Sequence, residues 1–98
     1  MEVGTEVQDR FFTPTGRLHT IPSKQAKLVL VLDRVAQAFE PGIKYPEAEV
    51  NAILLGFHDD YAALRRYLVE NGFLSREGGI YWRTGGTVDV EGQSLTSE

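Results

Sequence analysis

The chain has 98 residues, enough for one hydrophobic core but too few for a second domain, so a catalytic cleft between two domains is excluded. It contains no cysteine, which excludes disulfides, thiolate metal sites and thiol nucleophiles. Its formal net charge of −4 argues against a strongly basic nucleic-acid-binding surface.

The acidity of the chain is concentrated at its two ends. Outside residues 9–83 there is no lysine or arginine, and the five acidic residues there are Glu2, Glu6, Asp89, Glu91 and Glu98. Ten basic and nine acidic residues remain inside that range. The part of the chain that holds the folding signals is therefore close to neutral.

Targeting signals are not expected. No apolar run approaches the roughly 20 residues needed to cross a bilayer. Residues 1–8 include two glutamates and no basic residue, unlike a secretory signal peptide. We therefore expect a soluble cytoplasmic protein that has no membrane partner.

Residues 11–22 are expected to form an irregular arm against the core, because they mix large apolar residues with turn formers: Phe11, Phe12, Pro14, Gly16, Leu18, Ile21 and Pro22. A first helix is predicted over residues 24–39, with Ser23 as its N-cap. Its apolar positions recur at helical spacing: Leu28, Val31, Leu32, Val35 and Phe39. Val29 and Leu30 widen this face, so either the arm packs on the back of the helix or part of the helix meets a partner chain.

The second half of the chain predicts a strand, two helices and a hairpin. A short strand is expected at 43–45, a second helix at 46–56 starting with a proline, and a third at 59–71 with Asp59 as its cap and Gly72 as its stop. Residues 73–76 and 80–83 flank Glu77-Gly78-Gly79, which is typical of a β-hairpin.

The two faces of the hairpin are assigned by alternation. Arg76, Tyr81 and Arg83 are expected on one face, and Leu74, Ile80 and Trp82 on the other. Trp82 is interpreted as an anchor in the core rather than a stacking platform.

This order of elements predicts an α+β fold of the winged helix-turn-helix type, with three helices and a C-terminal β-hairpin wing. The expected organisation is a flexible tail at 1–8, one winged-helix-like domain with its arm at 9–83, and a flexible tail at 84–98. The third helix would be the recognition helix. Fold alone does not decide function, because structural domains of protein complexes share this order.

Several residue groups also resemble a bacterial domain of unknown function, which occurs alone or attached behind ArsR-type helix-turn-helix regulators. They are Gly16-Arg17-Leu18, Ile21-Pro22-Ser23-Lys24, Phe39-Glu40-Pro41-Gly42, Tyr45, Glu49-Val50-Asn51, His58-Asp59-Asp60, Leu64-Arg65-Arg66-Tyr67-Leu68-Val69, Gly72 and Tyr81-Trp82-Arg83. The resemblance covers about residues 11–83. It implies a transcription-related context and no established ligand or catalytic residue.

Six residues are candidates for nucleic-acid binding: Lys24, Lys27, Arg65, Arg66, Arg76 and Arg83. The helical step places Arg65 and Arg66 on the solvent side of the third helix, where arginine could reach guanine or phosphate. Two aspartates at the start of that helix would repel phosphate. Pairing of these arginines with Glu70, Asp60 or a carboxylate of the second helix is the alternative.

No enzymatic chemistry, cofactor or metal site is expected. His58, Asp59 and Asp60 lack the helical His or Glu pair typical of zinc sites, and capping explains them better. Glu47 and Glu49 are two apart on a helix and do not face each other.

Two functions follow from these patterns. The first is binding of double-stranded DNA, or of another nucleic acid, by a domain with a role in transcription regulation. The alternative is a winged-helix module for protein interaction or homodimerisation through the first helix, without nucleic-acid binding.

Overall fold

A computed structural model describes residues 11–84 of the chain. Its elements are α2 (Gln25–Ala36), β1 (Lys44–Pro46), α3 (Glu47–Leu55), α4 (Tyr61–Glu70), β2 (Leu74–Glu77) and β3 (Ile80–Arg83). Three helices and a three-stranded antiparallel sheet form an α+β fold consistent with a winged helix. The expected tail at 1–8 and the expected tail beyond Thr84 lie outside the described residues.

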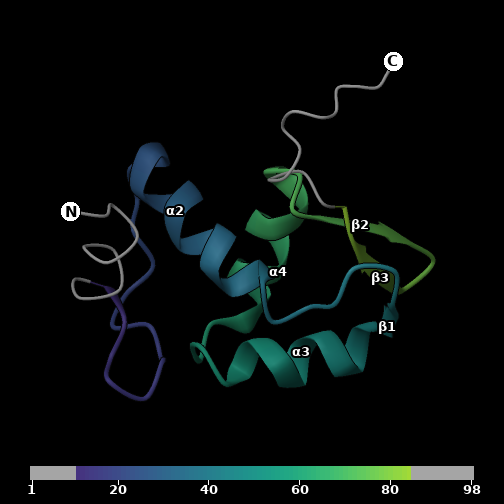
Figure 1. The fold of residues 1–98 in the computed structure, drawn as a ribbon, viewed down its shortest axis with the longest axis horizontal. Helices are drawn as coiled ribbons and strands as arrows, with labels where there is room; N and C mark the ends of the chain where they lie inside the picture. The colour runs from purple at the N-terminus through teal and green to yellow at the C-terminus, as the bar shows by residue number, and fades with distance from the viewer. Residues whose placement is uncertain (1–10, 85–98) are drawn as a thin grey trace.

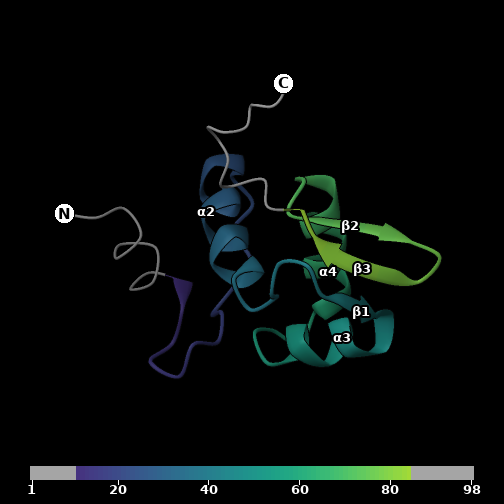
Figure 2. The ribbon, with the colours of Figure 1, turned by 45° about the vertical axis from the view of Figure 1, so that its right-hand side comes forward.

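The helices and the sheet are arranged around α4. Figures 1 and 2 show α4 between α2 and the sheet, with α3 running below them. Because α4 packs against α2, α3 and β2, its remaining face is left to solvent beside the hairpin. No helix within residues 11–84 is long and apolar enough to cross a membrane.

The core is built from the helical faces that periodicity predicts. Side chains with no exposed surface come from all three helices: Val31, Leu32, Val35, Val50, Leu54, Leu64 and Leu68. Two arm residues, Phe12 and Leu18, are also buried, and the Leu18 amide donates to the Phe57 carbonyl at 2.7 Å. The arm therefore belongs to the core. On the wide apolar face of α2, Val29 is half-buried against the core, while Leu30 remains 37% exposed.

The helix ends differ from the predicted ones. The predicted Ser23 cap is wrong, because Lys24 takes the N-cap position and no side chain caps α2. The helix also ends earlier, at Ala36, since the next residues form tighter turns with Phe39 donating to the Ala36 carbonyl. Phe39 nevertheless stays fully buried.

The boundaries of α4 are set by Asp60 and Gly72. Asp60, rather than the predicted Asp59, is the N-cap, and its Oδ1 accepts from the Ala63 amide at 3.2 Å. Gly72 ends the helix as expected, with φ of +81°, a conformation that residues with a Cβ rarely adopt. Its amide donates to the Val69 carbonyl, a bond typical of a Schellman end.

The sheet has the order β1-β3-β2, which makes β3 the central strand. Tyr81 faces Tyr45 on one side and Arg76 on the other. Gly78 and Gly79 both have positive φ, as the tight two-residue hairpin turn requires. The Gly79 carbonyl accepts from the Glu47 amide at 2.9 Å, so the tip of the hairpin is bonded to the start of α3.

The predicted hairpin faces are partly wrong. Arg76, Tyr81 and Arg83 do share a face, but Leu74 pairs with Arg83 and lies on that face too, and Tyr81 and Leu74 are each only 1% exposed. This is the core face, so Tyr81 is the buried anchor in place of Trp82. Trp82 is half-buried on the outer face, where the Lys44 ammonium lies 5.1 Å from its ring centroid.

Candidate nucleic-acid interface

The free face of α4 and the adjacent hairpin form a hollow of about 420 Å³. We call it the α4–hairpin hollow, and its lining residues are Ala62, Arg65, Arg66, Val69, Glu70, Arg76 and Tyr81. Three of the six predicted nucleic-acid-binding residues, Arg65, Arg66 and Arg76, therefore line one concave surface. They come from two consecutive elements, α4 and β2.

Arg65 is held by side chains of α3. Its Nη1 donates a hydrogen bond to the Asn51 Oδ1 atom and lies 3.9 Å from the Glu47 Oε2 atom. The Arg65 side chain is 23% exposed, compared with 62% for Arg66. Arg65 thus forms part of the floor of the hollow and has a fixed neighbour on α3.

Tyr81 completes this set of contacts from the sheet. Its hydroxyl donates to the Glu47 Oε1 atom at 3.0 Å. Burial, and then the hydrogen bond to Glu47, raise the pKa of Tyr81 above its ordinary value. The neutral phenol therefore stays a donor at neutral pH, and Glu47 joins the sheet to Arg65.

Arg66 lies at the rim. Its Nε is 3.7 Å from the Glu70 Oε2 atom one helical turn later, and its guanidinium carbon is 5.1 Å from the Tyr67 ring centroid. A solvent-exposed pair at this spacing stabilises a helix by only about 0.3–0.5 kcal/mol. A phosphate that approaches the hollow can therefore replace Glu70 as the partner of Arg66.

Arg76 lines the hollow from the hairpin side. It is exposed on β2, and its guanidinium carbon lies 5.9 Å from the Tyr81 ring centroid. Stacking of this kind orients the guanidinium and leaves its N–H groups at the edge available for hydrogen bonds.

The other three predicted residues lie outside the α4–hairpin hollow. Arg83 donates from Nη1 to the Phe39 carbonyl at 3.3 Å, which gives it a structural contact. Lys24 and Lys27 belong to the start of α2, and the hydrogen bond from Gln25 to Asn71 at 2.7 Å places that end beside the end of α4.

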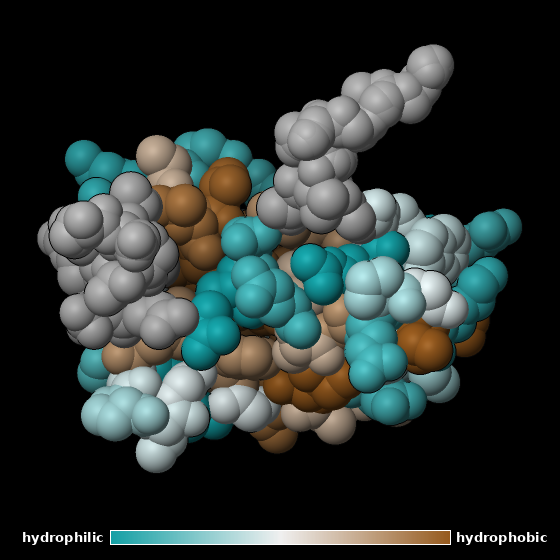
Figure 3. Space-filling view, in the orientation of Figure 1, coloured by the Kyte–Doolittle hydropathy of each residue, from teal (hydrophilic) through white to brown (hydrophobic). Residues whose placement is uncertain are grey.

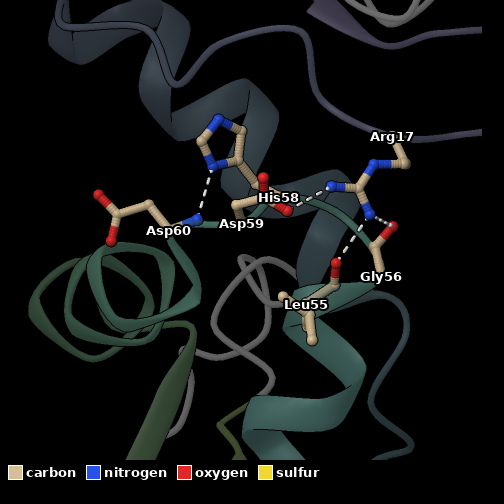
Figure 4. Close-up of polar contacts among 6 residues, drawn as sticks. All are labelled: Arg17, Leu55, Gly56, His58, Asp59 and Asp60. Carbon is tan, nitrogen blue, oxygen red and sulfur yellow. Dashed lines mark hydrogen bonds and ion pairs between the residues drawn. The ribbon is translucent and has the colours of Figure 1, made fainter.

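The start of α4 is less repulsive to phosphate than the sequence suggests. Figure 4 shows the Arg17 guanidinium reaching the end of α3 and the turn that follows, where it donates to the Leu55 and Gly56 carbonyls and lies 3.1 Å from the Asp59 Oδ1 atom. The His58 Nδ1 atom accepts from the Asp60 amide at 2.9 Å. One of the two carboxylates is thus paired with a cation and the other caps the helix.

The sequence did not indicate Asn51 or Arg17 as partners, and it indicated Glu47 only as an unspecified carboxylate of the second helix. The spacing of Glu47 and Asn51, four residues apart on one helix, was the available signal, because it places both side chains on the same face. The alternative pairing considered for the two arginines is present, with Glu70 for Arg66 and a carboxylate of the second helix for Arg65.

Residues 17–83, more than half of the chain, match the family described as "Uncharacterized protein conserved in bacteria (DUF2087)". The chain belongs to this family. No curated protein and no solved structure matches it significantly. The matched residues of this chain include every residue of the α4–hairpin hollow and the Arg17 contact.

Proposed function

We propose that this DUF2087 domain binds duplex DNA through the α4–hairpin hollow. The observation that supports this most is the convergence of Arg65, Arg66 and Arg76 from a helix and a hairpin on one concave surface. In a winged-helix arrangement, these are the two elements that approach the duplex. The groups they offer, guanidinium N–H donors, are suited to phosphate and to guanine.

The shape of the surface favours a helix in the major groove. Ala62 is exposed and Val69 half-buried on either side of Arg65 and Arg66 along α4, so small side chains cover the helix backbone beside the arginines. The major groove is about 12 Å wide and admits an α-helix with its side chains. The hairpin strands have only four residues each, so we expect Arg76 to contact the phosphate backbone rather than to extend along the groove.

Charge limits the expected affinity. Nine basic and eight acidic residues lie between positions 11 and 84, and Glu70 itself lines the hollow. We therefore expect weak binding at physiological salt, in the range of about 10⁻⁴ to 10⁻⁶ M that is typical of largely electrostatic association.

A role in transcription regulation is part of the proposal. It is supported by the resemblance of the sequence to a bacterial domain that also occurs behind ArsR-type helix-turn-helix regulators. Weak duplex binding would be useful next to such a regulator, because a second linked contact raises the overall affinity without a tight site of its own.

A duplex titration tests the proposal. Fluorescence anisotropy with a labelled duplex of about 20 base pairs, at about 50 mM salt, should show binding by the wild type. The double variant Arg66→Ala/Arg76→Ala should bind at least about tenfold more weakly, because two phosphate contacts are lost. The matched control is Lys44→Ala, which removes a cation from the outer face of the same sheet. Absence of wild-type binding, or an equal loss in the control, contradicts the proposal.

A second candidate function is protein contact through α2. It is supported by Leu30, a large apolar side chain on α2 that is 37% exposed, and Figure 3 shows hydrophobic side chains at the surface over this helix. It ranks second because single exposed leucines are common on proteins that act alone. Sedimentation at high concentration tests it: a dimer that Leu30→Glu dissociates would make α2 the functional surface.

A further inference from the structure

The three arginines of the α4–hairpin hollow are held in different ways. Arg66 and Arg76 are exposed and contact an aromatic ring, and Arg66 has one weak surface ion pair. Among the arginines that form ion pairs within residues 11–84, Arg65 is the least exposed, and its contacts reach a second helix. Its side chain therefore has less freedom to lose when a ligand binds.

The anchoring of Arg65 uses one part of its guanidinium. Among residues 11–84, the hydrogen bond to Asn51 and the ion pair with Glu47 both involve Nη1. The hydrogen bond from Tyr81 in turn fixes the Glu47 carboxylate. The edge formed by Nε and Nη2 makes no hydrogen bond within the described residues, and the residue lines the hollow.

An Nε–Nη2 edge presents two parallel N–H donors, which match a pair of acceptors set side by side. In a duplex, two groups offer such a pair: the N7 and O6 atoms of guanine in the major groove, and two oxygens of one phosphate. In the proposed docking, α4 is the helix that enters the major groove, so Arg65 on α4 is placed for a base edge, while Arg76 on the hairpin is placed for the backbone.

We propose that Arg65 is the specificity-determining residue of this surface and reads one guanine through its Nε–Nη2 edge, with Asn51 and Glu47 as positioning residues. This inference rests on the proposed binding of duplex DNA. Arg66 and Arg76 then supply affinity through phosphates, and the domain combines weak overall binding with a preference at one base pair.

The test begins with selection of bound duplexes from a pool with a randomised centre, using the full chain at low salt. The wild type should enrich guanine at one position. Replacement of that guanine by 7-deazaguanine, which lacks the N7 acceptor, should weaken binding by about fivefold to tenfold. A phosphate contact by Arg65 would leave this substitution without effect and would instead flatten the salt dependence in Arg65→Ala, which removes the charge.

Three variants and one control separate the reading of the base by Arg65 from the positioning of Arg65. Arg65→Lys keeps the charge but lacks the paired donors, so the preference for guanine should fall to about twofold or less. Asn51→Ala should also lose the preference, and Asn51→Asp, which retains an oxygen acceptor at this position, should regain part of it. Arg66→Ala is the matched control on the same helix and should keep the preference while binding more weakly. Thermal unfolding of each variant verifies that it folds.

The outcomes distinguish this inference from the function on which it rests. If the wild type binds duplex without a base preference, or if Arg65→Lys keeps the preference, Arg65 does not read a base although the binding function stands. If the wild type binds no duplex at low salt, both proposals are wrong.

Discussion

Removal of Arg66 and Arg76 together should change the salt dependence of duplex binding in a calculable way. These two arginines are exposed at the rim of the α4–hairpin hollow and are the cations assigned to phosphates. Each phosphate neutralised on duplex DNA contributes about −0.9 to the slope of log affinity against log salt. A near-neutral domain that contacts about three to five phosphates, two of them through these arginines, should have a slope of about −2.7 to −4.5.

The double variant Arg66→Ala/Arg76→Ala loses two of these contacts, so its slope should be flatter by about 1.8. Between about 50 and 200 mM salt, the wild type should therefore lose about tenfold more affinity than the variant does. Arg65→Lys should keep the wild-type slope, since its proposed contact is to a base and its charge is retained.

Anisotropy titrations at four salt concentrations measure the slopes, with Lys44→Ala as the control. The Lys44 ammonium lies over the Trp82 ring on the outer face of the sheet, away from the Tyr81 face that lines the hollow. Identical slopes for wild type and double variant, or an equal change in Lys44→Ala, would refute the assignment of the rim arginines to phosphates.

Three further predictions concern the scaffold. Arg17→Ala should lower the free energy of unfolding by about 1 kcal/mol, because two backbone carbonyls lose a charged donor, and urea unfolding that shows no loss would contradict this. Leu64→Ala truncates a side chain that has no exposed surface and should lower the free energy of unfolding by about 3 kcal/mol. A change in melting temperature near zero would be inconsistent with the core described. Burial and the hydrogen bond to Glu47 raise the pKa of Tyr81, so above about pH 10 the phenol deprotonates more readily in the unfolded chain and the wild type should lose stability. Tyr81→Phe should be less stable at neutral pH, but its free energy of unfolding should change less above about pH 10. Parallel curves of unfolding free energy against pH for the two proteins would argue against this.

The helices could be predicted from the sequence because their apolar spacing is regular and their interiors are buried on one side. The ends could not be placed as well. Both Asp59 and Asp60 are able to cap α4, and the choice depends on Arg17, which comes from the arm and engages Asp59. A contact between segments so distant in sequence has no local signal.

The orientation of the hairpin illustrates the same limit. Alternation divides Tyr81 and Trp82 between two faces but does not say which face is inside. Both are large aromatic residues, and the decision comes from β1, which places Tyr45 opposite Tyr81, and from Glu47, which accepts the phenol hydrogen bond. A buried tyrosine needs such a partner, and the partner is on another element.

Three of the six predicted cations line the candidate hollow, and the way in which they are held there could not be predicted. The solvent side of the third helix identified Arg65 and Arg66, and the hairpin identified Arg76. Arg65 is held in place while Arg66 and Arg76 stay exposed. This difference depends on how α3 packs against α4, because Asn51 lies within hydrogen-bonding distance of Arg65 only in the folded protein.

The central claim, that the α4–hairpin hollow is the DNA-binding surface, is tested most directly by a two-dimensional NMR titration of the full chain with a short duplex at low salt. We expect the largest changes in backbone amide chemical shift at Ala62, Arg65, Arg66, Val69 and Arg76, and we expect these changes to reverse when salt is raised. Shifts confined to α2 around Leu30 or to the outer sheet face around Trp82, or no shifts at all, would contradict it.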